Sequence, residues 1–341
     1  MTGRVSCNDL RPQAANLRAT LVGEQTGRVP RQELFFNNPR LERRLIGREC
    51  RGEPQARLEL ALALGWGMCN SGSWALRAGA RDEIASDGTS HYAGGSELTW
   101  ETVERMAEAP APPMDEIARN ITRCRSEGLL AQVFMLHCFH SAATGIGMQR
   151  LCMMVYDAPD LLAEYMRQVE AFNRRGLQAL LDTRVTPDIA IFDADCAFKT
   201  SMMVSPSDYR ELIFEPTAAT CEMLAEAGIT ILMHTDGKID DVYPIWLEMG
   251  LQGAHGVEKQ ANDLAEVKRS FGDRMTLFGN FDPVTLATET PEAIHVAARE
   301  MVEIGRPGGR YVASVNTIVG EHVPPENYLA FIEGVDSAAE F

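Results

Sequence analysis

The sequence predicts an α/β fold, and three observations support that class. From about residue 185 onward a short apolar run, a loop with a glycine and an amphipathic segment follow one another five times, which is the pattern of repeated βα units. The apolar runs are continuous rather than alternating, as in strands of a parallel sheet covered on both faces. No nucleotide-binding glycine motif follows any of these runs, so a closed (β/α)8 TIM barrel is favoured over an open sheet.

The strands of the C-terminal half are the clearest elements. We expect them at "DIAIFDAD" (188–195), "GITILMH" (228–234), "LQGAHGVE" (251–258), "RMTLFGNFD" (274–282) and "GRYVASVN" (309–316). Helices follow them: Ser205 with Pro206 marks the start of one, and Thr290 with Pro291 the start of another.

The N-terminal half has a weaker pattern. Residues 28–36 and 127–140 are expected to be early strands with their loops, and residues 158–182 a long amphipathic helix. The polar residues 72–112 predict small antiparallel strands or loops inserted near one end of the barrel. We therefore expect a helical extension over residues 1–25 and a single barrel domain over residues 26–341, with an irregular segment in its N-terminal third.

Charge and composition narrow the function classes. The 32 basic and 48 acidic residues give a net charge of -16, a field that repels nucleic acid and anionic lipid. The eight cysteines form no C-x-x-C pair, so we expect reduced thiols. No signal-peptide core and no apolar stretch of about 20 residues is present, which predicts a cytoplasmic protein that does not enter a membrane.

Five consecutive predicted strands end in side chains that can bind a cation or a proton. In a parallel α/β barrel the chemistry lies at these strand ends. In chain order they are Asp193 and Asp195, His234 and Asp236, Glu258, Asn280 and Asp282, and Asn316. If these residues were only polar loop residues, Lys, Ser and Gly would occur there as often as Asp, Asn, Glu and His. The excess of residue types that can bind a metal therefore favours a site.

His234 and Asp236 are two residues apart, so on an extended segment their side chains point to the same side. Glu258 and Asn316 can converge with them only in a barrel. One imidazole and three oxygen donors would suit Zn²⁺ or a harder divalent ion. The alternative is a hydrogen-bonded strand-end histidine and a turn-forming aspartate before Gly237, and both interpretations stay open.

Other candidates have two interpretations each. Asp193 and Asp195 form either a carboxylate pair for acid–base chemistry or an Asx-type turn. The His and Cys of "HCFH" suggest metal ligands but have no partners at ligand spacing, so the alternative is that His137 packs or lines the pocket. Glu33 on the first strand makes either a core salt bridge or a substrate contact, and Asn280 is a further candidate substrate contact.

The chain resembles the uroporphyrinogen decarboxylase superfamily, which also includes cobalamin-dependent methyltransferases. The resemblance is carried mainly by the C-terminal half, in "IFDADCAFKTSMMVSPSDYRELIFEP", "ILMHTDGKIDD", "DLAEVKRSFGDRMTLFGNFDP", "TPEAI" and "VPPENY". "GRVP" and "SAATGIGMQRLCMMVYDAPDLLAEYM" are similar to its N-terminal landmarks. It implies a (β/α)8 barrel with its site at the C-terminal mouth.

The resemblance favours the methyltransferase branch over true decarboxylases. Decarboxylases of the family carry an arginine-rich stretch that holds substrate carboxylates, whereas this chain has "RQELFFNNP" there. Thiol-methylating relatives bind zinc with a His-x-Cys pair and a later Cys. The matching positions here are His234, Asp236, Glu258 and Asn316, so oxygen donors replace both thiolates, and an ether or carboxylate substrate fits better than a thiol.

The resemblance thus implies a corrinoid-linked methyltransferase that takes a methyl group from a small O-methyl or other methylated substrate. The cobalamin would be held by a partner corrinoid protein. A divalent metal, with zinc as the first candidate, would be held by His234, Asp236, Glu258 and Asn316. The resemblance is also compatible with a homodimer. Asp193, Asp195 and Asp282 would orient or protonate the leaving oxygen. The rivals are a decarboxylase using Arg210, Lys199 and Lys238, and a metal-free small-molecule or corrinoid-binding barrel.

Overall fold

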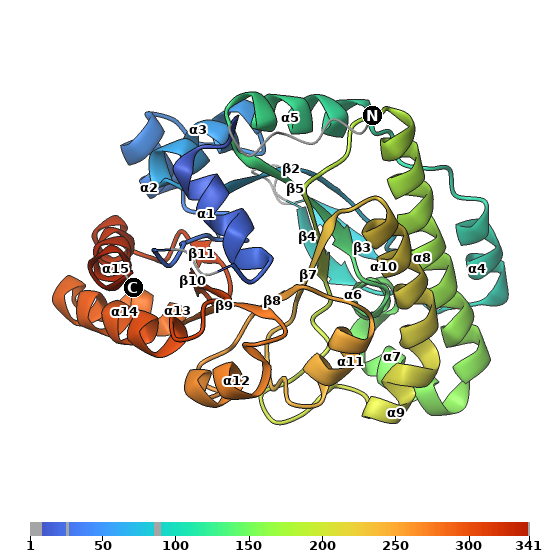
Figure 1. The fold of residues 1–341 in the computed structure, drawn as a ribbon. Helices are drawn as coiled ribbons and strands as arrows, with labels where there is room; N and C mark the ends of the chain where they lie inside the picture. Colours follow the sequence, from blue (N-terminus) through green and yellow to red (C-terminus); the bar gives the residue numbers. More distant parts are fainter. Residues whose placement is uncertain (1–8, 25–26, 85–89, 340–341) are drawn as a thin grey trace.

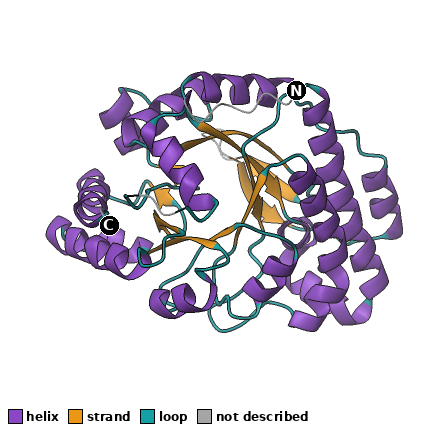
Figure 2. Cartoon of the chain, in the orientation of Figure 1, coloured by secondary structure: helices purple, strands orange, loops and turns teal. Residues whose placement is uncertain are grey.

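The fold is a parallel barrel of strands surrounded by helices (Figures 1 and 2). A computed structural model describes residues 9–24, 27–84 and 90–339. Seven parallel strands form one curved sheet in the order β10-β9-β8-β7-β6-β5-β2. They are β2 (Met68–Trp74), β5 (Leu130–Leu136), β6 (Ile189–Asp193), β7 (Thr230–His234), β8 (Gly253–His255), β9 (Thr276–Phe281) and β10 (Tyr311–Val315).

Arg31 and Gln32 lie between the two edges of this sheet and complete the barrel. On one side Arg31 forms a parallel bridge with Ala313 of β10. On the other side the buried side chain of Gln32 accepts hydrogen bonds from the Gly67 and Met68 amides and donates one to the Met68 carbonyl. A side-chain amide therefore replaces strand pairing at this seam, and the predicted (β/α)8 fold is confirmed.

The helices lie outside the sheet, as the parallel topology requires. The long helix expected at 158–182 is α8 (Pro159–Asp182), and Ser205 and Thr290 cap their helices as predicted. The other helices are α2 (Pro39–Ile46), α3 (Pro54–Leu64), α4 (Trp100–Ala107), α5 (Asp115–Ser126), α6 (Cys138–Ala142), η2 (Ala143–Gly147), α7 (Met148–Asp157), α9 (Pro206–Tyr209), η3 (Arg210–Phe214), α10 (Glu215–Glu226), α11 (Val242–Glu248), α12 (Leu264–Phe271), α13 (Pro283–Thr288), α14 (Pro291–Gly305) and α15 (Pro325–Ala338).

The irregular N-terminal third contains the predicted antiparallel pair. It is formed by β3 (Arg81–Ile84) and β4 (Ser90–Gly94). A two-stranded parallel ladder, β1 (Phe36–Asn37) with β11 (Val319–Gly320), lies near the seam of the barrel. The strand β2 is an element that the sequence pattern did not predict.

The helix within residues 1–25 is α1 (Pro12–Leu21), which closes the end of the barrel opposite the strand C-termini. The hydroxyl of Thr276, the first residue of β9, donates to the Thr20 carbonyl. The buried Ala14, Leu17 and Leu21 belong to the same hydrophobic core as the barrel strands. Among the described residues, no helix is both long and apolar enough to span a bilayer.

Candidate active site

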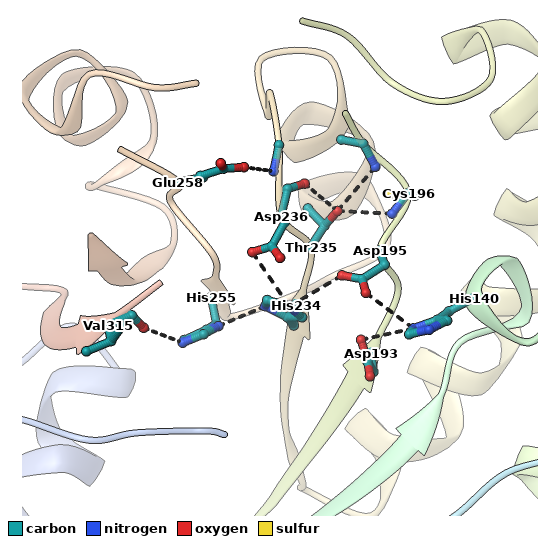
Figure 3. Close-up of polar contacts among 12 residues, drawn as sticks. His140, Asp193, Asp195, Cys196, His234, Thr235, Asp236, His255, Glu258 and Val315 are labelled. Atoms are coloured by element: carbon teal, nitrogen blue, oxygen red, sulfur yellow. Dashed lines mark hydrogen bonds and ion pairs between the residues drawn. The ribbon is translucent and has the colours of Figure 1, made fainter. Parts of the chain in front are cut away.

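Five ligand-type side chains meet at the C-terminal mouth of the barrel (Figure 3). We call them the mouth cluster: His140, Asp193, Asp195, His234 and Asp236. His140 lies on α6 after β5, Asp193 ends β6, and His234 ends β7. Because β5, β6 and β7 are adjacent and parallel, their C-terminal ends bring these groups to one point.

The orientation of the His234 ring follows from its neighbours. His255 lies opposite His234 in the β7–β8 ladder, and their Nδ1 atoms are 2.8 Å apart. The Nε2 of His255 lies 3.1 Å from the Val315 carbonyl oxygen, which can only accept a hydrogen bond, so this Nε2 carries hydrogen. Burial is the main cause that lowers the pKa of His255 well below its ordinary value. A neutral His255 must therefore accept at Nδ1, and His234 donates to it.

His234 therefore turns its Nε2 to the mouth. That atom lies 3.4 Å from Asp195 Oδ1 and 4.0 Å from Asp236 Oδ1, and the His234 side chain is only 4% exposed. A lone pair facing two carboxylate oxygens is repulsive unless a cation or a proton lies between them.

His140 makes the second set of contacts. Its Nδ1 lies 3.2 Å from Asp193 Oδ1 and 3.7 Å from Asp195 Oδ2. Burial acts to lower the pKa of His140, but the hydrogen bond and the charge of Asp193 outweigh it and raise that pKa. For Asp193, burial acts in the opposite sense, and His140 leaves the pKa of the carboxyl below its ordinary value.

The backbone around the cluster is tied together by Thr235. Its hydroxyl accepts hydrogen bonds from the amides of Cys196 and Ala197 and donates to the Asp236 carbonyl (Figure 3). Gly256 has a φ of 96°, and a Cβ there would meet the Thr235 carbonyl oxygen at 2.0 Å. The loops after β6, β7 and β8 are thereby fixed against one another.

Asp236 is a half-exposed carboxyl in an acidic environment. Burial is the largest of the causes that raise its pKa to about 6; His234 opposes the rise, and Asp195, Glu258 and Asp193 add to it. A cation beside Asp236 would reverse this effect, since opposite charge favours the ionised carboxylate.

Two cavities border the mouth cluster. The larger, of about 640 Å³, is lined by Asp193 and Glu33 together with the aromatic side chains Phe35, Phe134 and Trp74. The smaller, of about 450 Å³, is lined by His140, Asp195, Asp236, Glu258 and Lys199. The cluster is thus reachable from two sides by a molecule of substrate size.

The structure brings together some of the residues predicted to bind metal and separates others. His234 and Asp236 are adjacent, and Asp195 joins them within 4.8 Å. Glu258 instead accepts a hydrogen bond from the Gly237 amide and lies 3.9 Å from Lys199 Nζ. Asn316 is buried, and its Oδ1 has no hydrogen-bond partner among the described residues.

Asp282 and His137 each have hydrogen-bond partners within the fold, and their predicted site contacts stay predictions. Asp282 caps α13, where one carboxylate oxygen accepts from both the amide and the hydroxyl of Thr285. His137 is fully buried, with its two ring nitrogens contacting the Phe139 amide and the Thr217 hydroxyl. Burial lowers the pKa of His137 to about 3. The packing interpretation of His137 is the one that these contacts support.

Glu33 and Asn280 are both buried. Glu33 accepts hydrogen bonds from the Ser314 hydroxyl, the Val315 amide and the Tyr328 hydroxyl, and burial is the dominant cause that raises its pKa to about 8. It lines the larger cavity, which keeps a substrate contact open. The amide of Asn280 donates to the Met301 sulfur, and its predicted substrate contact stays a prediction.

Two residues of the site were not assigned from the sequence. His140 belongs to the "HCFH" motif, from which only His137 was proposed. His255 lies inside the barrel between His234 and Val315.

The comparisons with known proteins agree with this architecture. The sequence profile of the uroporphyrinogen decarboxylase (URO-D) family matches residues 97–338, more than half of the chain. The chain belongs to the uroporphyrinogen decarboxylase family. The resemblance seen in the sequence is thereby confirmed.

Curated members of the family are distant relatives. A uroporphyrinogen decarboxylase from Thioalkalivibrio sulfidiphilus is 32% identical over 96 residues, 27% of each chain. One from Coxiella burnetii is 23% identical over 192 residues, 54% of this chain and 49% of the relative. The chain therefore spans about half or less of the length of these relatives.

Among solved structures, a methyltransferase from Methanosarcina mazei is similar over nearly the whole chain. The TM-score is 0.71 at 17% identity, over 95% of this chain and 98% of that one. This similarity shows a common fold.

Proposed function

We propose that this member of the family transfers a methyl group from a small O-methylated, or otherwise methylated, substrate to a corrinoid cofactor carried by a partner protein. His234, Asp236 and Asp195 would hold a divalent cation, for which zinc is the first candidate. The observation that carries the proposal is the position of His234 Nε2, which faces two carboxylates while Nδ1 of the same ring is hydrogen-bonded to His255.

The donor set fits such a cation. The Oδ1 atoms of Asp195 and Asp236 are buried and have no hydrogen-bond partner among the described residues. One imidazole nitrogen with carboxylate oxygens is acceptable to Zn²⁺ and to harder divalent ions, and when bound such an ion polarises oxygen as a Lewis acid. Glu258 and Asn316 remain predicted ligands, and Glu258 would have to release the Gly237 amide to serve.

The protein's own residues would then divide the work of binding the substrate. The aromatic walls of the larger cavity exclude water and bury the apolar part of a substrate. Asp193 lies where that cavity meets the cluster, so it is placed to orient a substrate oxygen. His255, by contrast, positions His234 and does not itself line either of the two cavities.

Electrostatics disfavour decarboxylation of a polycarboxylate at this mouth. Asp193, Asp195, Asp236 and Glu258 gather there, and each of the three cations suggested from the sequence already has a partner. Lys199 donates to Gln260, Lys238 pairs with Asp240, and Arg210 pairs with Glu248. An anionic substrate would meet like charge, which costs binding energy.

The test combines metal analysis with an activity assay. Protein purified without chelators is analysed for metal content, and methylation of cob(I)alamin is followed by absorbance with a panel of methoxylated compounds. We expect bound metal and turnover, both lost in His234→Gln and retained in His322→Gln, a matched change at an exposed histidine.

Two outcomes would overturn the proposal. Absence of metal together with absence of cobalamin methylation would favour a metal-free binding barrel. Release of carbon dioxide from uroporphyrinogen, in the same preparation, would favour the decarboxylase.

A further inference from the structure

We infer that the mouth holds a second divalent transition-metal ion, bound by His140, Asp193 and Asp195, so that Asp195 bridges two cations. The inference rests on the proposed function only for the first cation, at His234. The second set of ligands comes from different elements, α6 and the end of β6.

The two sets share one residue but use different atoms of it. Asp195 directs Oδ1 toward His234 and Oδ2 toward His140 (Figure 3). In each set the three ligand atoms lie within 4.8 Å of one another. A carboxylate that offers one oxygen to each of two imidazoles has the arrangement of a bridging ligand, and two-metal sites place their ions about 3.5–4 Å apart.

Three of the four nitrogen–oxygen separations within the cluster are longer than a hydrogen bond, and the fourth, from His140 Nδ1 to Asp193 Oδ1 at 3.2 Å, is within hydrogen-bond reach. A charge-assisted N–H···O bond measures about 2.7–2.9 Å, whereas the four nitrogen–oxygen separations are 3.2, 3.4, 3.7 and 4.0 Å. Two ligands bound tetrahedrally to one zinc ion, each about 2.1 Å from it, lie about 3.4 Å apart. The gaps between the side chains are therefore of the size that metal ligands leave.

The unsatisfied atoms are independent support. Four buried atoms of the cluster have no hydrogen-bond partner of acceptable geometry among the described residues: His140 Nδ1 and the Oδ1 atoms of Asp193, Asp195 and Asp236. Buried polar atoms are normally satisfied, because leaving one unpaired destabilises the fold. Atoms of both sets are on this list. In the second set His140 Nδ1 and Asp193 Oδ1 face each other at 3.2 Å, so a protonated His140 paired with Asp193 is the alternative to an ion there.

The second set is also held rigidly and is accessible. The amide of Cys138, at the start of α6, donates to the buried Glu170, which fixes the helix that carries His140. Asp193 faces the larger cavity and His140 the smaller one. An ion there would lie between the two cavities, where a substrate oxygen from either side could reach it.

The competing explanation is a protonated His140 that pairs with Asp193 and Asp195 and binds no metal. The two explanations differ in the number of ions bound. The experiment measures Mn²⁺ and Zn²⁺ stoichiometry by equilibrium dialysis on the full chain, with electron paramagnetic resonance of the Mn²⁺ form as a second readout, since neighbouring Mn²⁺ ions couple.

We expect two ions per wild-type chain and an exchange-coupled Mn²⁺ spectrum. His140→Gln and Asp193→Asn should each bind one ion with an uncoupled spectrum, and His322→Gln should keep two. Thermal melting confirms that each variant is folded. The Asp193→Asn change keeps the size of the side chain, so it tests the site even if His140→Gln fails to fold.

The outcomes separate this inference from the proposed function. One ion in the wild type that persists in His140→Gln and is lost in His234→Gln overturns the second ion and leaves the first. No ion in the wild type overturns both. Two ions that survive both His140→Gln and Asp193→Asn would be bound elsewhere, which overturns the second site.

Discussion

Two groups of ligand-type residues lie close together in this barrel, and only one of them has the properties of a site. The inner cluster, His137, Cys138 and Glu170, offers a nitrogen, a sulfur and an oxygen within 4.8 Å, as each set of the mouth cluster does. Its atoms, however, already have partners. Glu170 accepts from the Cys138 amide, the Thr220 hydroxyl and the Asn173 side chain.

The two clusters differ in whether their polar atoms have hydrogen-bond partners and in whether a cavity reaches them. Both contain residue types that bind metals. The inner cluster is fully buried and lines neither of the two cavities at the mouth, whereas the mouth cluster has four buried atoms without partners and borders both. Hydrogen bonds to charged or buried groups stabilise a fold, while unpaired groups beside a cavity are available for a ligand. Four variants test this comparison.

Asp195→Asn should have the largest effect, because Asp195 contacts both histidines of the mouth cluster. We expect turnover in the methyl-transfer assay to fall about 10³-fold, the scale of losing one group that stabilises developing charge. Metal content should fall in parallel while the melting temperature changes little. A variant that keeps its metal and its activity would remove Asp195 from the site.

Glu170→Ala should have the opposite signature, a loss of stability without a loss of metal. It leaves the Cys138 amide, Thr220 and Asn173 without their buried acceptor, which costs about 3 kcal/mol of unfolding free energy. Urea denaturation measures this cost, and Glu248→Ala, an exposed carboxylate, is the matched control. Loss of metal from folded Glu170→Ala would break the comparison.

The fold could be predicted from the C-terminal half because each strand there is a continuous apolar run. The strand β2 escaped prediction because its sequence, "MCNSGSW", is polar and its register shifts between Asn70 and Ser73. The closure of the barrel at Gln32 could not be predicted either, because the Gln32 side chain, and not a strand backbone, makes the hydrogen bonds there.

The site could be predicted in part for a similar reason. Asp193, Asp195, His234 and Asp236 follow recognisable strands, so their convergence follows from the topology. His140 lies on a helix one turn beyond its strand, where the sequence gives no direction for its side chain. His255 could not be placed by extending strand alternation from Glu258, because β8 ends at His255 and Gly256, with a φ of 96°, breaks the alternation.

His255→Phe tests whether the mouth cluster depends on a residue that contacts His234 from behind and lines neither cavity. The ring is kept, but the hydrogen bond that sets the His234 tautomer is lost, and we expect the dissociation constant for Zn²⁺ to rise about 10–100-fold. His255→Gln retains an acceptor for His234 and should restore part of that affinity. Equal affinity in His255→Phe and the wild type would show that His234 needs no such partner.

Glu33→Gln should give the smallest effect, because Glu33 is satisfied like the inner cluster although it lines a cavity. Its pKa is about 8 in the fold against 4.5 for the free side chain, so between those values the folded chain keeps a proton that the unfolded chain has released. Stability therefore falls as pH rises through this window, by about 1 kcal/mol per pH unit. Glutamine can still accept from Ser314 and Val315 and does not titrate, so the variant's unfolding free energy between pH 5 and pH 8 should decline less steeply. Urea denaturation at pH 5, 6.5 and 8 measures the slope of unfolding free energy against pH, with the exposed Glu326→Gln as control. Equal slopes in the wild type and Glu33→Gln would show that Glu33 is ionised in the fold. Glu33 would then belong with the mouth cluster as a charged group.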